Sequence, residues 1–143
     1  MKGALLKIFL CMTLAACGLC GCSDKPKVIK NSAQLLAAQN QKWNECLEFC
    51  AKGQPNLDKL YDLGGFLGSR TRVTMEKEYA KPNKEQAIAL LKEIGEEYQT
   101  NVISLTEATE QGKVLKPGVT NEDVCKAFKA MNEKYQKLVE MTK

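Results

Sequence analysis

Cysteine is the residue type in this sequence with the most chemistry to offer, and its placement divides the chain into two parts. Four of the seven cysteines fall within the first 22 residues, at Cys11, Cys17, Cys20 and Cys22. Three remain for a folded body, namely Cys46, Cys50 and Cys125. A cysteine sulfur can carry a covalent lipid, join a disulfide or ligate a soft metal ion. The residues around each of these two sets of cysteines therefore decide its chemistry.

The first 16 residues have the layout of an export signal. Lys2 and Lys7 supply positive charge, residues 8–16 carry none, and small residues lead into Cys17. These are the three parts of a removable secretory signal. The uncharged run over residues 8–22 is shorter than the roughly 20 residues that a membrane-spanning helix needs. We therefore predict that residues 1–16 form a signal that is cleaved. This interpretation is preferred to a membrane anchor that is retained.

The residues Leu14-Ala15-Ala16-Cys17 resemble the lipobox of bacterial lipoproteins. In that class the cysteine receives a diacylglycerol, the signal is cut before it, and the new amino group is usually acylated, with palmitate as a typical chain. The resemblance implies that Cys17 is lipidated. Cys22 is the alternative acceptor, and cleavage after Ala16 without lipid is the alternative process. Several acyl chains on one cysteine suffice for stable anchoring.

The resemblance also implies a location in the cell envelope. Neither Gly18 nor Ser23, which follow the two candidate acceptors, is Asp. By resemblance to the enterobacterial sorting rule, this favours the outer membrane if the cell is Gram-negative. The domain would face the periplasm or the exterior, where disulfides persist. Its expected partners are the lipid bilayer, through the acylated cysteine, and an envelope protein.

Composition favours helices and argues against catalysis. Ala, Leu, Lys, Glu and Gln are abundant, aromatic residues make up 6%, and histidine is absent. These five abundant residue types are strong helix formers. Without histidine, the Ser-His and Cys-His pairs of nucleophilic enzymes are missing, so we expect no enzyme and no cofactor. The net charge of +4 is modest and the charges are interspersed, so no nucleic-acid partner is expected.

The chain after the signal divides into a tether over residues 17–30 and a helical domain over residues 31–143. We predict helices over residues 31–52, from residue 57 to about residue 80, over residues 83–112, and from residue 120 onward. Asn31 or Ser32 would cap the first, and Thr120 or Asn121 the last. Asn83 with Gln86 would form a capping box for the third.

Apolar spacing in the third and fourth segments predicts buried stripes. Steps of three and four residues connect Ala87, Leu91, Ile94, Tyr98, Val102 and Leu105. The last segment repeats the pattern at Val124, Phe128, Met131, Tyr135 and Leu138. No strand is expected. Short connections make neighbouring helices antiparallel, so the predicted fold is an all-α up-down bundle of three to four helices.

This topology predicts a disulfide. Cys50 comes late in the first helix and Cys125 early in the last, so both would lie at the same end of the bundle. Cys46 and Cys50 are four residues apart in one helix, too far to bridge each other. We predict a Cys50–Cys125 disulfide, with Cys46–Cys125 as the alternative. The spare thiol would be a small buried side chain.

The same three sulfurs allow a different interpretation, a soft-metal site. Cys46-x-x-x-Cys50 could bind Cu(I), with Cys125 or Met131 as the third ligand. The absence of histidine argues against zinc or blue-copper centres.

A glycine-rich stretch interrupts the second segment at Gly64, Gly65 and Gly68. Glycine weakens a helix, so we expect a kink, a close approach to a neighbouring helix, or a binding loop. The only arginines in the chain, Arg70 and Arg72, follow directly. Backbone N–H groups beside guanidinium groups offer a possible anion contact.

Together these features predict a membrane-anchored envelope lipoprotein that acts as a non-enzymatic protein-interaction or accessory subunit. Such a protein would expose an apolar patch, for which Phe66 and Leu67 are candidates. The alternative is a small-ligand or Cu(I)-binding protein that uses the end of the bundle with Cys46, Cys50 and Cys125.

Overall fold

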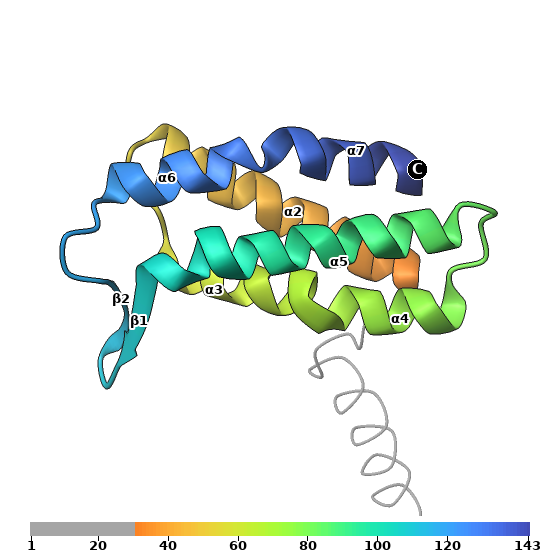
Figure 1. Ribbon diagram of the computed structural model, residues 1–143, viewed down its shortest axis with the longest axis horizontal. Coiled ribbons are helices and arrows are strands. Elements are labelled where there is room, and N and C mark those ends of the chain that lie inside the picture. Colours follow the sequence, from red (N-terminus) through yellow and green to blue (C-terminus); the bar gives the residue numbers. More distant parts are fainter. Residues whose placement is uncertain (1–30) are drawn as a thin grey trace, which may run out of the picture.

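A computed structural model describes residues 31–143, most of which are helical (Figure 1). The helices are α2 (Ser32–Ala51), α3 (Leu57–Gly65), α4 (Thr71–Glu78), α5 (Lys84–Asn101), α6 (Asn121–Ala130) and α7 (Asn132–Thr142). The remaining elements are the π-helical turn η1 (Phe66–Arg70), the 3-10 turn η2 (Ile103–Leu105), and the strands β1 (Thr106–Thr109) and β2 (Gly112–Leu115). The predicted all-α helical bundle is confirmed, with a small hairpin added to it. The predicted signal and tether lie outside the described residues.

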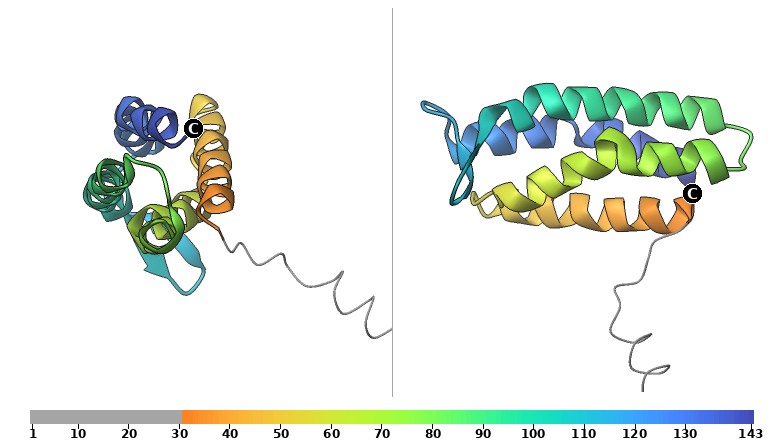
Figure 2. Two further views of the ribbon diagram at one scale, coloured as in Figure 1. Left: turned by 90° about the vertical axis from the view of Figure 1, so that its right-hand side faces the viewer. Right: turned by 90° about the horizontal axis from the view of Figure 1, so that it is seen from below.

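The chain runs up and down through four rods (Figure 2). They are α2, the continuous arm α3–η1–α4, α5, and the pair α6–α7. The start of α2, the end of α4, the start of α5 and the C-terminus gather at one end, which we call the proximal end. The end of α2, the hairpin and the start of α6 share the opposite, distal end.

The first helix begins where its cap predicts. The side chain of Asn31 accepts a hydrogen bond of 2.8 Å from the backbone N–H of Gln34. This bond satisfies a donor that the first turn leaves free. The helix ends before Gly53, which adopts a left-handed backbone with φ of 70°.

One of our interpretations expected the second rod to break at its glycines, and it does not. A π-helical turn carries the chain from α3 into α4 without interruption. The extra residue in such a turn shifts the helical face. Phe66 and Leu67 therefore both point inward and are only 3% and 0% exposed. Our expectation of an exposed apolar patch at these two residues was wrong.

The closest helix contact occurs at Gly95 of α5, which the glycine pattern did not single out. A Cβ atom at this position would collide with the carbonyl oxygen of Leu67 and lie 3.0 Å from its carbonyl carbon. At Gly64 the neighbours are side chains, with Tyr98 3.3 Å away, and Gly68 has open space. The missing side chain of Gly95 lets α5 lie against the backbone of η1.

The third helix is shorter than predicted. It ends at Asn101, and residues that we assigned to its last turns form the hairpin. The strands are antiparallel, with Thr106 opposite Leu115 and Thr109 opposite Gly112. Gly112 has φ of 124°, which a right-handed helix cannot accommodate. The expectation of no strand was therefore wrong.

The predicted capping box at Asn83 is also absent. Its side chain caps nothing in α5 and instead contacts the C-terminal helix. The amide Nδ2 donates a hydrogen bond of 2.7 Å to the carbonyl oxygen of Met141, and Oδ1 accepts a hydrogen bond of 3.2 Å from the Tyr79 hydroxyl. Asn83 thus joins the second, third and fourth rods at the proximal end.

The fourth rod begins with a capping box and bends once. The Thr120 hydroxyl accepts from the Asp123 backbone N–H, and the Asp123 carboxylate accepts from Thr120 in return. The rod divides at Met131 into α6 and α7. All five residues of the predicted stripe, Val124, Phe128, Met131, Tyr135 and Leu138, are buried.

Trp43 occupies the centre of the core and is fully buried. Its ring lies 3.9 Å from that of Tyr135 in a stacked arrangement and 4.6 Å from that of Phe128. Its indole N–H donates a hydrogen bond of 2.8 Å to Oδ1 of Asn132. The indole therefore fixes α2 against the last rod by both stacking and a hydrogen bond.

The Gly95→Ala substitution tests the close contact between α5 and η1. We expect it to lower the free energy of unfolding by about 2 kcal/mol, because the helices must separate to admit the methyl group. Gly68→Ala is the matched control and should be neutral or stabilising by up to about 1 kcal/mol. Urea unfolding measures both. Equal effects of the two substitutions would contradict the contact.

Candidate functional site

The structure contains the first of the two predicted cysteine pairings. Cys50 and Cys125 form a disulfide, with their Cα atoms 5.2 Å apart and a separation of 75 positions in the sequence. Cys46 is the free cysteine among residues 31–143 and is buried. The pairing exists because the last turn of α2 and the first turn of α6 lie side by side at the distal end (Figure 1).

The free thiol is chemically quiet. Burial raises the pKa of the Cys46 thiol to about 12, so it stays protonated at neutral pH. A protonated thiol is neither a good nucleophile nor a metal ligand. Cys46 therefore behaves as a small apolar side chain within the core.

The predicted Cu(I) ligand set is not assembled. The disulfide occupies Cys50 and Cys125, which leaves Cys46 as the one thiol of the three. Within residues 31–143, no group of three His, Cys, Asp or Glu side chains is placed to hold a metal ion.

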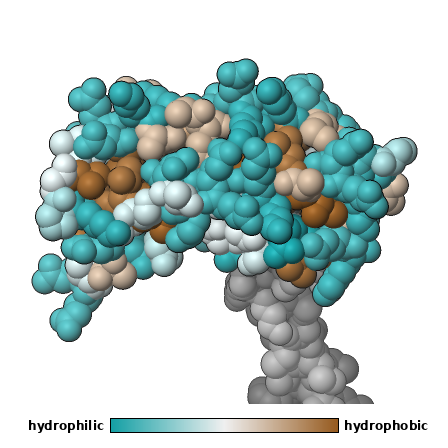
Figure 3. Space-filling view, in the orientation of Figure 1, coloured by the Kyte–Doolittle hydropathy of each residue, from teal (hydrophilic) through white to brown (hydrophobic). Residues whose placement is uncertain are grey.

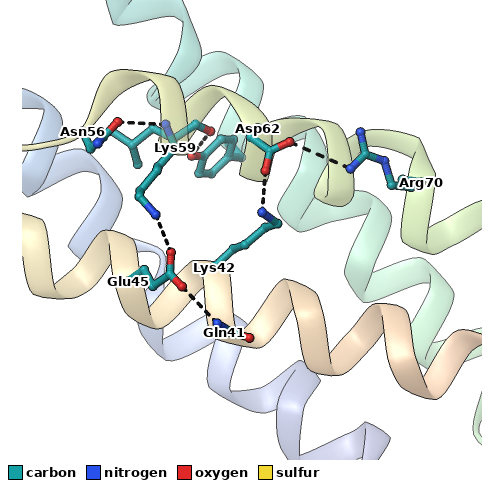
Figure 4. A network of polar contacts seen from close by, with 9 residues as sticks. Gln41, Lys42, Glu45, Asn56, Lys59, Asp62 and Arg70 are labelled. Carbon is teal, nitrogen blue, oxygen red and sulfur yellow. Dashed lines mark hydrogen bonds and ion pairs between the residues drawn. The ribbon is translucent and has the colours of Figure 1, made fainter. Parts of the chain in front are cut away.

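The guanidinium groups of the two arginines do not point to a common site. Arg70 lies 3.9 Å from the Asp62 carboxylate (Figure 4), and it covers the ring of Phe66 at 4.4 Å. Arg72 pairs with Glu76 on its own helix at 2.7 Å. Each guanidinium thus has its own carboxylate partner, and the possible anion contact beside the glycines stays a prediction.

Asp62 and Arg70 belong instead to a surface network between α2 and α3 (Figure 4). Lys42 reaches Asp62 at 2.6 Å, and Lys59 reaches Glu45 at 2.7 Å. The hydrogen bond from Lys59 lowers the pKa of the Glu45 carboxyl. These pairs link the two helices at the surface, and Asp62 and Arg70 also line a cavity of about 360 Å³ together with Gly64 and Gly65.

The hairpin is the most exposed ordered element at the distal end. Three of the four residues of β1 are exposed, and Val114 of β2 is 37% exposed. Lys113 places its ammonium group 3.7 Å from the ring centre of Tyr61, which is itself 46% exposed. This contact fixes β2 against α3, so the hairpin has a defined position beside the bundle.

A groove of about 770 Å³ lies next to the disulfide at the same end. Cys50 and Cys125 form part of its wall, and Lys126 and Lys129 contribute positive charge. The groove and the hairpin both flank the chain segment that enters α6. Glu122 lines the same groove, so the distal end offers a concave surface of mixed charge and a projecting strand pair.

Apolar residues elsewhere on the surface are scattered. In the view of Figure 3, hydrophobic areas are separated by hydrophilic ones. The large exposed hydrophobic side chains among residues 31–143 are Tyr61, Val73 and Val114. Two of these belong to α3 and β2, the elements joined at the distal end.

The predicted lipidation residues Cys17 and Cys22 lie outside the described residues. Across residues 31–143, no helix combines the length and hydrophobicity needed to cross a bilayer.

No protein-family model matches this chain, and comparisons with curated proteins and with solved structures find no similar protein. The functional argument therefore depends on the geometry of the chain itself.

Reduction of the disulfide should lower the free energy of unfolding by about 4 kcal/mol, because the bond closes a long loop in the unfolded chain. Urea unfolding with and without dithiothreitol measures the loss. Cys125→Ser should abolish the response to reductant, whereas Cys46→Ala should keep it. Non-reducing peptide mapping that recovers Cys46 joined to Cys125 would contradict the assigned pairing.

Proposed function

We propose that this protein is a lipid-anchored envelope lipoprotein that works without catalysis, as an accessory subunit that contacts another envelope protein through its distal end. The observation that supports this proposal is the position of the hairpin. It projects from the end of the bundle opposite the start of α2, where the predicted tether joins (Figures 1 and 2).

The hairpin is longer than the fold requires. Helices in bundles are usually joined by about two to eight residues. Here the chain from residue 102 to residue 120 connects α5 to α6, and it includes two paired strands. Binding residues lie disproportionately on surface connections that a rigid scaffold positions. We therefore assign partner contact to this element.

The geometry suits a protein held at a membrane. With lipid on Cys17, the proximal end would face the bilayer. Helix α2 has 20 residues and spans about 30 Å. The hairpin and the neighbouring groove would then stand away from the membrane, accessible to a partner in the aqueous space.

The partner would meet polar backbone and charged side chains. Glu107, Glu110 and Lys113 lie on or between the exposed strands, and Lys126 and Lys129 line the groove. Strand edges with free N–H and C=O groups offer hydrogen bonds to an extended segment. An interface of this kind is polar, with the exposed side chain of Val114 as an apolar contact.

Metabolic labelling with a palmitate analogue tests the anchor. The unmutated chain should incorporate label, Cys17→Ala should lose it, and Cys22→Ala should retain it. The reverse pattern would move the acceptor to Cys22. Absence of label from the unmutated chain would overturn the lipoprotein assignment.

Photocrosslinking in cells tests the contact end. A photoreactive residue in place of Val114 should give a discrete protein adduct, whereas one in place of Glu85, exposed at the proximal end, should not. Replacing residues 106–115 by a short Gly-Ser connection should abolish co-purification of the crosslinked partner while the helical circular dichroism persists. Equal adducts from both positions would contradict a distal contact surface.

A further inference from the structure

The cavity of about 360 Å³ beside the π-helical turn lies at the surface, between the second and third rods. Its walls come from α3, η1, the last turns of α5 and η2. Tyr61 and Ile103 supply apolar surface, Gln99 supplies an amide, and Arg70 supplies a positive charge. Pockets for small molecules range from about 300 to 1,000 Å³, so this one suits a ligand at the lower end of that range.

The π-helical turn sets the direction in which Arg70 points. In a regular α-helix, residues five apart lie about 140° from each other around the axis. In η1 the backbone N–H of Thr71 bonds to the carbonyl of Phe66, five residues back, so residues at this spacing come close to one face. The Arg70 Nη2 atom consequently lies 3.6 Å from the position that a Cβ atom of Gly65 would occupy. Arg70 thus folds back over α3 at the edge of the pocket.

Gly65 is bare at this point although the packing does not require it. Its backbone angles, φ of −65° and ψ of −36°, are those of an ordinary helix. Among residues 31–143, the one side chain within 4 Å of a Cβ atom there is that of Arg70. At Gly64, by contrast, a Cβ atom would press on Tyr98 and Ile103. Glycine weakens a helix relative to alanine, so packing explains Gly64 but not Gly65, which leaves space beneath the guanidinium group.

The Arg70 guanidinium is held by stacking, and its donors stay available. It covers the ring of Phe66 at 4.4 Å, and its Nη1 atom lies 3.9 Å from the Asp62 carboxylate, beyond hydrogen-bond distance. Lys42 lies 2.6 Å from the same carboxylate and balances its charge. An anion at Arg70 would therefore meet N–H groups without an acceptor, beside an acid that already has a cation.

We propose that this pocket binds a small organic monocarboxylate whose apolar body is about the size of a benzene ring. The carboxylate pairs with the forked N–H groups of Arg70, and the body lies against Tyr61 and Ile103. A cavity of about 150 Å³ holds one benzene molecule, so 360 Å³ admits a ring together with its carboxylate. Of the two arginines, Arg70 is the one involved, because Arg72 hydrogen-bonds to Glu76 at 2.7 Å. This binding is independent of the proposed lipid anchor.

Titration of the ¹⁵N-labelled full chain with benzoate, followed by amide NMR signals, tests the proposal. The signals of Gly64 and Gly65 should shift along one saturable curve, whereas that of Glu85 at the proximal end should not. Benzamide has the same ring without the charge and should bind about tenfold more weakly, because hydrogen bonds between charged groups are the stronger ones. Inorganic phosphate has the charge without the ring and should also bind more weakly than benzoate.

Substitutions of charged residues separate the site from a general attraction of anions. Arg70→Gln should abolish the saturable shift with benzoate, and Arg70→Lys should weaken binding about fivefold, since a lysine lacks the planar fork. Asp62→Asn should tighten binding about twofold, because it removes a like charge beside the carboxylate. Arg72→Gln is the matched control and should bind as the unmutated chain does. The Arg70 side chain is 52% exposed, so its variants should keep the helical circular dichroism.

Three results would overturn the proposal. Equal binding of benzoate and benzamide would remove the role of the carboxylate. Binding of phosphate as tight as that of benzoate would remove the role of the apolar walls. Unchanged binding by Arg70→Gln, or no saturable shift at Gly64 and Gly65, would exclude this pocket as the site.

Discussion

The structure depends on how its first helix is held to its last. Neither α2 nor the α6–α7 rod is joined to the other by a short connection, so side chains must close the bundle between them. Trp43 does this at the centre, by stacking on Tyr135 and donating to Asn132. The disulfide does it at the distal end. Because the indole is fully buried and its N–H is satisfied, this contact also sets which residues of the last rod face inward.

The contact between these two rods is uneven along its length. A covalent bond holds the distal end, so the bundle there can support a long hairpin without losing its packing. At the proximal end the same two rods are joined only by a weak contact from Gln39 to Tyr135, and a groove remains.

Local patterns in the sequence predicted what depends on periodicity and chain order. The stripe from Val124 to Leu138 is buried as expected, and the ends of the first and last helices meet at the disulfide. The hairpin was missed because Glu107, Glu110 and Gln111 are good helix formers, and its turn lacks the usual Asn-Gly signal. Gly95 was missed for a different reason. The sequence of one helix does not show how closely a neighbouring helix approaches it.

The groove at the proximal end illustrates a further limit of pattern reading. Ala33, Ala37 and Gln39 look unremarkable in a helix of mixed polarity, since alanine and glutamine are both favourable there. Only the packing shows that the alanines border a groove and that the amide is buried without a donor. Ala33 and Ala37 are nevertheless exposed, so the high helix propensity of alanine is sufficient to account for both.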